Sequence, residues 1–235
     1  MKKAVVTLGV HVPDLLLISE PLLRAYAQKV DADFIKIENK VMDKLIIYPF
    51  PCFEKFQMKD MLDNYERIIY LDADILVQKD TPNLFDIVPE TEVGGVYDNF
   101  KNEPSEVDSS NNYYEYFYSM FFIQKVLGKV DWGGKYFNAG VLVFSKLHSH
   151  IFDFYPKLIN NLVPLMDQTL INWNMHKWGY KFFKLSRDFN ATPHNYDESN
   201  FYINGKLAHI LHFAGRRLKK KPMMEKYLRL ISETK

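Results

Sequence analysis

The sequence predicts an α/β protein in which helices flank a mainly parallel central sheet. Over residues 1–100, short apolar runs alternate with longer segments whose apolar residues recur at helical spacing. The strongest run, Ile68–Leu71, is typical of a buried strand and ends directly at acidic residues. No repeat and no linker composition interrupts this pattern, so we expect one domain over residues 1–235.

The elements of the first half follow from two periodicities. Strands are predicted at 4–9, 33–38, 68–71 and 93–97, and helices from about Asp14 and over 53–62. In the first helix, Leu and Ile residues recur at spacings of three and four, which places them on one face. Residues 98–113 are polar and aperiodic, and a loop of this length inside a compact domain is usually functional or mobile.

The second half continues the pattern with less regularity. The predictions are strands at 136–145 and 207–213, helices over 148–163 and 167–177, and a closing helix after the basic segment 216–221. An aromatic cluster, Tyr113–Tyr118, precedes these elements. Core packing is the ordinary role of such a cluster, and a wall that contacts a sugar is the alternative.

Composition limits the classes of function. Of the 235 residues, 47% are hydrophobic and 25% are charged, as in ordinary globular proteins. The 30 basic and 29 acidic residues leave a net charge of +1, so no overall field attracts nucleic acid. No apolar run approaches the ~20 residues of a membrane span. The single cysteine, Cys52, excludes an internal disulfide and a zinc–thiolate cluster, and it fits a reducing, cytoplasmic location.

Asp72 and Asp74 form the most informative motif. In an extended segment, residues i and i+2 point to the same side, so both carboxylates can converge on one ion. Proteins usually hold Mg²⁺ or Mn²⁺ by one or two carboxylates together with substrate phosphates. Because the pair follows a strand, at the edge where open α/β sheets bind ligands, it predicts a metal–phosphate site. A solvated acidic turn is the alternative.

Other classes of protein also place such an acid pair after a strand. A phosphatase of the haloacid-dehalogenase type expects Thr or Val two residues after the second acid, where this chain has Leu76. A sugar-phosphate nucleotidyltransferase expects a glycine-rich first loop, which this sequence lacks. A non-catalytic carbohydrate- or nucleotide-binding protein is the third alternative. An assay of the hydrolysis of UDP-sugars with Mn²⁺ would distinguish it from an enzyme.

Three further segments accompany the acid pair. With YLDADILV at 70–77, the chain carries YFNAGVLVF at 136–144, DQTLIN at 167–172 and HFAG at 212–215. In this order they resemble the retaining glycosyltransferases of the glycogenin and lipopolysaccharide galactosyltransferase family, glycosyltransferase family 8. The resemblance covers Val5 to about Lys221. It implies a single GT-A-type nucleotide-diphospho-sugar transferase domain.

The resemblance implies that Asp72, Asp74 and His212 bind Mn²⁺, with Mg²⁺ as an alternative, and that the metal binds the diphosphate of a UDP-sugar. Two carboxylates and a neutral imidazole suit Mn²⁺. For His212 alone, a histidine hydrogen-bonded in the core is the ordinary interpretation. The neighbouring Gly215 favours the metal site, since glycine lets the backbone approach a phosphate closely.

The basic segment departs from the family pattern, in which a lysine that binds phosphate follows this glycine. Lys219 is nearest to the expected position, displaced by one residue, and Arg217 and Lys221 are alternatives. A solvated basic tail and a contact with an acidic membrane surface are the other interpretations.

The resemblance also implies which residues hold the donor sugar. They are Asp98, Asn138, Ala139, Asp167 and Gln168. A buried Asn in an apolar strand is costly unless it is hydrogen-bonded, so a structural Asn turn is the alternative for Asn138. Asp98 ends its strand as Asp72 does, one strand further along, where it can accept hydrogen bonds from sugar hydroxyls.

Four more positions are assigned to the nucleotide. Thr7 and Leu8 end the first strand where a nucleobase can lie, Lys55 matches a basic residue that reaches toward the donor, and Ala73 lies between the two acids. A tyrosine that stacks on uracil in the family has no counterpart, because other residue types occupy 11–13. The resemblance therefore leaves the identity of the base open.

Together these implications predict a retaining, Mn²⁺-dependent enzyme that moves glucose or galactose from a UDP-sugar to a hydroxyl of a glycan or glycoconjugate. Its nucleotide-sugar-binding part is expected at about 1–100, and its acceptor and metal-completing part at about 101–235. Asp167 and Gln168 are the catalytic candidates. Since the Gln168 amide is a weak nucleophile, we prefer attack by the acceptor from the face that the diphosphate leaves. The alternatives are a catalytically weak relative and a glycogenin-like protein that glucosylates its own tyrosine; a homodimer is left open.

Overall fold

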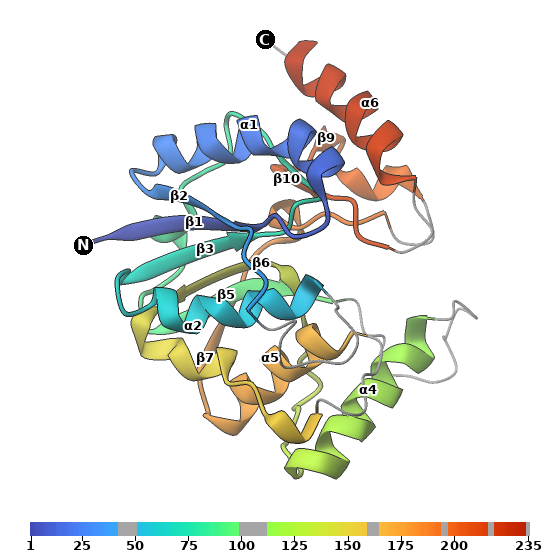
Figure 1. Ribbon diagram of the computed structural model, residues 1–235. Coiled ribbons are helices and arrows are strands. Elements are labelled where there is room, and N and C mark those ends of the chain that lie inside the picture. The colour runs from blue at the N-terminus through green and yellow to red at the C-terminus, as the bar shows by residue number, and fades with distance from the viewer. Residues whose placement is uncertain (42–50, 99–111, 159–164, 194–196, 216–218, 234–235) are drawn as a thin grey trace.

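A computed structural model describes residues 1–41, 51–98, 112–158, 165–193, 197–215 and 219–233. Its centre is a six-stranded sheet in the order β2-β1-β3-β6-β5-β7 (Figure 1). The strands are β1 (Lys3–Leu8), β2 (Asp33–Ile37), β3 (Arg67–Leu71), β5 (Glu92–Tyr97), β6 (Phe137–Ser145) and β7 (Lys181–Lys184). β6 is antiparallel to both of its neighbours, while the other pairs are parallel. The mainly parallel sheet is thus confirmed.

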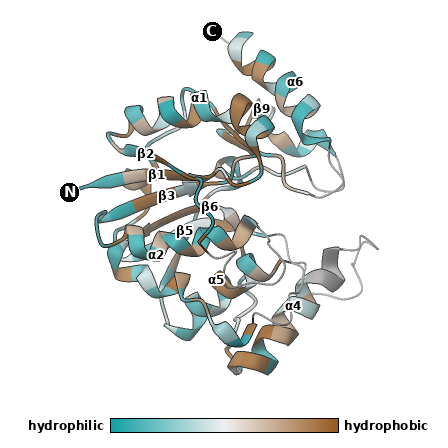
Figure 2. Cartoon of the chain, viewed as in Figure 1, coloured by the Kyte–Doolittle hydropathy of each residue, from teal (hydrophilic) through white to brown (hydrophobic). Residues whose placement is uncertain are grey.

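The strands are buried on both faces, since successive side chains point to opposite sides of a sheet. In β3, Ile68 and Tyr70 belong to one core cluster, and Ile69 and Leu71 belong to the other. Helices α1 (Pro13–Lys29) and α3 (Leu84–Ile87) contribute to the second cluster. Figure 2 shows apolar residues along the central strands and many hydrophilic positions on α1, while much of α4 is apolar.

The other face of the sheet is covered by short helices that lie far apart in the sequence (Figure 1). They are the 3₁₀ helices η2 (Pro51–Gln57), η4 (Lys146–Phe152) and η5 (Pro156–Leu158), with helices α2 (Met58–Met61) and α5 (Met166–Lys177). Helix α4 (Asn112–Leu127) packs against α5. α5 is buried over almost its whole length, so its polar side chains lie inside the protein.

A smaller layer extends one end of the sheet. It consists of the antiparallel pair β4 (Ile75–Val77) and β10 (Ile210–His212), the hairpin β8 (Tyr202–Ile203) and β9 (Lys206–Leu207), the 3₁₀ helices η6 (Arg187–Phe189) and η8 (Glu198–Phe201), and helix α6 (Lys220–Glu233). The third core cluster joins α1, the β4–β10 pair and α6, with Met224 and Tyr227 as the buried residues of α6.

Several predicted elements differ from the structure. The helix predicted over 148–163 is replaced by η4 and η5, and residues 159–164 lie outside the described part. A break at His148, with non-helical φ and ψ, and Pro156 prevent a continuous helix here. The strand predicted over 207–213 is divided between β9 and β10. Helix α4, with most of the aromatic cluster, was not predicted, and the polar loop lies almost entirely outside the described residues.

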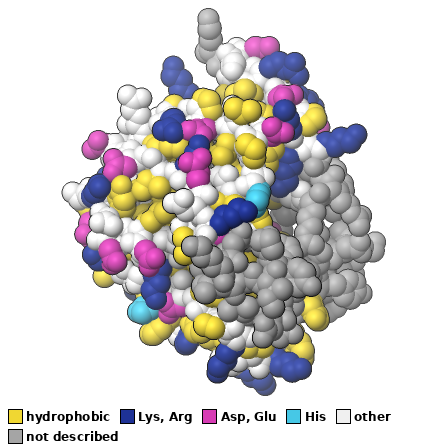
Figure 3. Space-filling model, in the orientation of Figure 1, with side chains coloured by type: hydrophobic (Ala, Val, Ile, Leu, Met, Phe, Trp, Pro, Cys, Tyr) yellow, Lys and Arg dark blue, Asp and Glu magenta, His cyan; other side chains and the backbone are white. Residues whose placement is uncertain are grey.

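Among the described residues, no helix is both long enough and apolar enough to span a bilayer. On the face shown in Figure 3, basic and acidic side chains are interspersed over the described surface.

Candidate functional site

The acid pair and the distant histidine meet at one end of the sheet. Asp72 follows β3, Asp74 precedes β4, and His212 ends β10. One ligand atom from each lies within 4.8 Å of the others. His212 Nε2 is 3.6 Å from Asp72 Oδ2 and 3.4 Å from Asp74 Oδ1. The predicted convergence of these three residues is therefore present in the structure.

Backbone pairing on both sides produces this convergence. In the β4–β10 ladder His212 is opposite Ile75, and Phe213 N–H donates to Asp74 O at 2.9 Å. On the other side, Asp72 N–H donates to Gly140 O of β6 at 2.9 Å. The turn between the acids is held from α1, where Ser19 Oγ donates to Ala73 O at 2.7 Å. The two carboxylates are thus fixed by main-chain bonds to two different strands.

The donor set fits a hard or borderline divalent cation. Two carboxylates and one imidazole supply oxygen and nitrogen ligands of the kind that Mn²⁺ accepts, and Mg²⁺ accepts the oxygens. His212 Nδ1 lies 2.8 Å from Asn190 Oδ1, and an amide oxygen can only accept. Nε2 is the ring nitrogen that faces the two carboxylates.

Gly140 makes room for the histidine. A Cβ atom at this position would lie 2.2 Å from His212 Cε1 and 2.7 Å from His212 Nδ1, closer than real contacts allow. The glycine in the apolar run of β6 is therefore required by the site and not by a turn.

Lys55 is buried between two carboxylates. It lies on η2, and its Nζ is 3.1 Å from Asp72 Oδ1 and 3.1 Å from Asp167 Oδ2, the latter in the first turn of α5. Burial alone lowers the pKa of Lys55, but the charges of Asp72 and Asp167 outweigh burial and raise it. Tyr70 OH also donates to Asp72 Oδ1, at 2.5 Å. Lys55 thus stays charged and orients one face of Asp72.

The lysine at the other carboxylate is Lys220. Its Nζ lies 2.6 Å from Asp74 Oδ2. Burial raises the pKa of Asp74, but the charges and hydrogen bonds of His212 and Lys220 outweigh it and hold that pKa below its ordinary value. Lys219, predicted from the sequence, is exposed just before α6. Gly215 has φ +126, a conformation that favours glycine, and Arg217 lies outside the described residues.

Three of the five predicted sugar-binding residues, Asp98, Ala139 and Gln168, are joined by hydrogen bonds. Gln168 Oε1 accepts from Ala139 N–H at 3.0 Å, and Gln168 Nε2 donates to Asp98 Oδ2 at 3.2 Å. Asp98 Oδ2 also accepts from Tyr116 OH of α4 at 2.7 Å. Burial, together with the charge of Asp98, raises the pKa of the Tyr116 phenol. The Asp98 side chain is thus held in place by an amide and a phenol.

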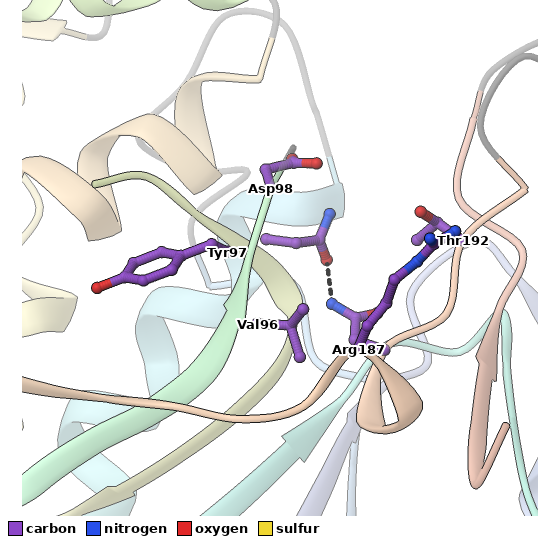
Figure 4. A pocket seen from close by; sticks show the side chains of 7 residues that line it. Val96, Tyr97, Asp98, Arg187 and Thr192 are labelled. Carbon is purple, nitrogen blue, oxygen red and sulfur yellow. Dashed lines mark hydrogen bonds between the residues drawn. The ribbon is translucent and has the colours of Figure 1, made fainter. Parts of the chain in front are cut away.

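Asn138 is one of the residues that line a pocket between β5, β6 and η6 (Figure 4). Its Oδ1 accepts from Gly140 N–H at 2.9 Å and from Asn190 Nδ2 at 3.0 Å, the bond drawn dashed in Figure 4. The pocket is lined by Val96, Tyr97, Asp98, Asn138, Arg187, Asn190 and Thr192. Asn138 thus makes structural hydrogen bonds within and beside β6, and it is also one of the residues that line the pocket with Asp98.

Thr7 and Leu8 occupy the end of β1 and are buried. The Thr7 Oγ1 atom is buried without a hydrogen-bond partner among the described residues. A buried hydroxyl without a partner is uncommon.

Sequence reasoning missed three residues of this site. Asn190 and Tyr116 contact His212 and Asp98, and Lys220 contacts Asp74. Asn190 follows a short 3₁₀ helix in a polar stretch without periodicity, so nothing local distinguishes it. A tyrosine in an aromatic cluster gives no sign of which hydroxyl is used. Lys220 was one of three consecutive lysines, and only the start of α6 decides which of them turns inward.

The edge of a mainly parallel sheet, with carboxylates, amides and lysines gathered there, is the architecture of nucleotide-binding α/β enzymes. Residues 27–222 match the model of the family described as "Glycosyl transferase family 8". The chain belongs to this family and is a glycosyltransferase. A comparison with curated proteins gave no significant match.

Solved structures share the fold at low sequence identity. A structure of the galactosyltransferase LgtC with donor and acceptor sugar analogues has a TM-score of 0.59 at 14% identity, covering 97% of this chain and 95% of that one. A glycosyltransferase involved in glycosylation of the major capsid of PBCV-1 has a TM-score of 0.58 at 10% identity, covering 98% and 100%. The bifunctional glycosyltransferase WbbM has a TM-score of 0.62 at 16% identity, covering 99% of this chain and 50% of its own.

Proposed function

We propose that the protein transfers a hexose, with retention of anomeric configuration, from a UDP-sugar to a hydroxyl of a glycan or glycoconjugate. The proposed reaction requires a divalent cation, for which Mn²⁺ is the first candidate. UDP-glucose and UDP-galactose are the first donors to test. The observation that carries the proposal is the convergence of Asp72, Asp74 and His212 within 4.8 Å at the ligand-binding edge of the sheet.

The leaving group defines the first task of the site. When the bond at the anomeric carbon breaks, negative charge grows on the diphosphate, and a cation bound by Asp72, Asp74 and His212 would stabilise it electrostatically. Lys220, which contacts Asp74 from α6, would turn toward the diphosphate when the donor binds. Lys55, through its ion pair, orients the Asp72 carboxylate.

The donor sugar is assigned to the network at the ends of β5 and β6. Asp98 offers a carboxylate to sugar hydroxyls, while Tyr116 and Gln168 fix its direction. Asn138 and Ala139 bring the start of β6 to the same place. The division of the chain into a nucleotide part over about 1–100 and an acceptor part over about 101–235 remains part of this proposal.

Retention is explained best by attack from the face that the diphosphate leaves, with a diphosphate oxygen removing the acceptor proton. The Gln168 carbonyl oxygen, the other candidate nucleophile, already accepts a hydrogen bond from Ala139 N–H. Asp167 is engaged with Lys55. If Asp167→Asn accumulated a glycosyl–enzyme adduct in intact-mass spectra, the same-face route would be wrong.

The test is turnover of UDP-sugars with and without Mn²⁺, together with thermal shifts. A ligand that binds only the native state raises the melting temperature, so UDP-sugars should do so in the presence of metal and much less after chelation. Asp60→Asn, an exposed acid on α2, serves as the matched control for Asp72→Asn. Shifts independent of metal would overturn the metal requirement. Binding without turnover would favour the catalytically weak relative, and a mass increase of the protein itself would favour self-glucosylation.

A further inference from the structure

We propose that Asn190 is a positioning residue for His212: it fixes the imidazole tautomer that directs Nε2 at Asp72 and Asp74. This inference rests on the proposed metal requirement and adds to it a residue outside the metal-binding motifs. Asn190 is 3% exposed and lies beside the histidine, not beside the proposed ion.

The orientation of the Asn190 amide follows from a backbone group. Gly140 N–H donates to Asn138 Oδ1 at 2.9 Å, so this oxygen is an acceptor by necessity. Asn190 must therefore turn its NH₂ group to Asn138, and the distance from Nδ2 to Oδ1 is 3.0 Å. Its own oxygen then faces His212 Nδ1 at 2.8 Å. Because the Asn190 oxygen only accepts, His212 must hold a proton on Nδ1.

Main-chain bonds hold Asn190 in this place. Ala191 N–H donates to Ile210 O at 3.0 Å, and His212 N–H donates to Ala191 O at 2.8 Å. The residue after Asn190 thus pairs with β10 on both sides of Leu211. These main-chain hydrogen bonds bring the Asn190 and His212 side chains together. The hydrogen bond between the two side chains therefore forms without rearrangement of the backbone.

The arrangement has two consequences for binding. A histidine that binds a metal through Nε2 usually donates its other N–H to a fixed acceptor, and loss of that acceptor typically costs ~10–100-fold in metal affinity. In addition, Asn138 lines the pocket next to Asp98 and also orients Asn190. The proposed metal ligand and the proposed sugar pocket therefore share one hydrogen-bond chain.

The experiment measures Mn²⁺ affinity from the electron paramagnetic resonance signal of the free hydrated ion. We expect Asn190→Leu, which has similar size but no acceptor, to weaken Mn²⁺ binding ~10–100-fold. Asn190→Asp keeps an acceptor for Nδ1–H but loses the donor to Asn138 Oδ1, so it should lose less Mn²⁺ affinity than Asn190→Leu. The matched control is Asn174→Leu, since Asn174 is another buried Asn of structural role, bonded to the Ile151 and Asp153 carbonyls.

The outcomes distinguish the proposed metal requirement from the proposed role of Asn190. If the wild type binds no Mn²⁺, the proposed metal requirement fails, and this inference fails with it. If the wild type binds and Asn190→Leu binds equally well, only the inference about Asn190 is wrong. Equal losses in Asn190→Leu and Asn174→Leu would indicate a general effect of destabilisation and would also contradict it.

A second measurement does not depend on a stable leucine variant. In ¹⁵N spectra of the metal-free wild type, with His212 assigned by the missing signal in His212→Gln, we expect a proton on Nδ1. A His212 that carries its only proton on Nε2 would overturn the proposal.

Discussion

The Nζ atom of Lys220 lies 2.6 Å from the Oδ2 atom of Asp74. Asp74 is one of the three residues proposed to bind the metal, so a cation of the protein already contacts a carboxylate that the ion needs. Lys220 is the first residue of α6, whose buried residues Met224 and Tyr227 pack in the third core cluster. The position of α6 therefore determines whether the Lys220 ammonium group contacts the Asp74 carboxylate.

The first prediction concerns the competition at Asp74. Lys220→Met should tighten Mn²⁺ binding several-fold without nucleotide, because the ion no longer displaces an ammonium group. The same change should weaken binding of UDP in the presence of Mn²⁺, since a cation for the diphosphate is lost. Isothermal titration with Mn²⁺, and then with UDP, measures both. Lys221→Met is the control, because Lys221 is half-exposed and lies 3.9 Å from Asp14. Changes of the same sign in both titrations would contradict this account.

The second prediction concerns the buried lysine. Lys55→Met leaves Asp72 and Asp167 without their shared counter-charge, and breaking a buried ion pair in this way costs about 3–5 kcal/mol of unfolding free energy. Urea unfolding measures this loss, and Mn²⁺ should restore part of it by neutralising Asp72. Lys59→Met, which breaks an exposed pair with Asp153, should cost at most about 1 kcal/mol. Similar losses in the two variants would show that Lys55 is not the counter-charge of the site.

The third prediction concerns the space around the histidine. Gly140→Ala places a methyl group 2.2 Å from His212 Cε1, so the ring must move away from the acid pair. Mn²⁺ affinity should fall by about the 10–100-fold that disturbance of a ligand's support typically costs. Gly95→Ala on the neighbouring strand is the control, because its nearest contact would be 3.3 Å, with the Phe182 ring. Unchanged Mn²⁺ binding in Gly140→Ala would mean that the ring is not held at this contact.

The fourth prediction concerns stability and pH. Burial, only partly offset by a hydrogen bond with the Thr91 backbone, lowers the pKa of His148. The unfolded state therefore binds more protons than the folded state as the pH falls through about 6.5, the ordinary histidine value, and stability falls with it. The slope from this residue is at most about 1.4 kcal/mol per pH unit. His148→Asn, which keeps an acceptor for Ser145 N–H, should show a smaller loss between pH 7.5 and 5.5 in urea unfolding; an unchanged slope would exclude His148 as its source.

The proximity of Asp72 and Asp74 was the part of the site that a local sequence signal predicted. Asp72 and Asp74 are two residues apart after an apolar strand, and this spacing alone predicts a shared ion. His212 could be linked to them only by resemblance, because the β4–β10 pairing joins segments far apart in the chain. Asn190 and Lys220 were missed because their roles depend on backbone pairing and on where a helix starts. The prediction of a helix over 148–163 was wrong because buried 3₁₀ turns show the same pattern of apolar residues as a buried α-helix.

The direction of β6 has a consequence for the whole site. It enters the sheet at the edge where its neighbours β3 and β5 leave it. In a purely parallel sheet, only the carboxyl ends of strands would lie at this edge. Here the amino end of β6 lies there too, so Asn138 and Ala139 come between Asp72, which follows β3, and Asp98, which follows β5. Since side chains alternate along a strand, a slip of one residue in β6 would turn the Asn138 side chain to the opposite face. The register of β6 is fixed by its apolar residues 141–144, which pair with β3 and β5. These apolar residues therefore determine how the Asn138 amide is aligned with the Asp72 and Asp98 carboxylates.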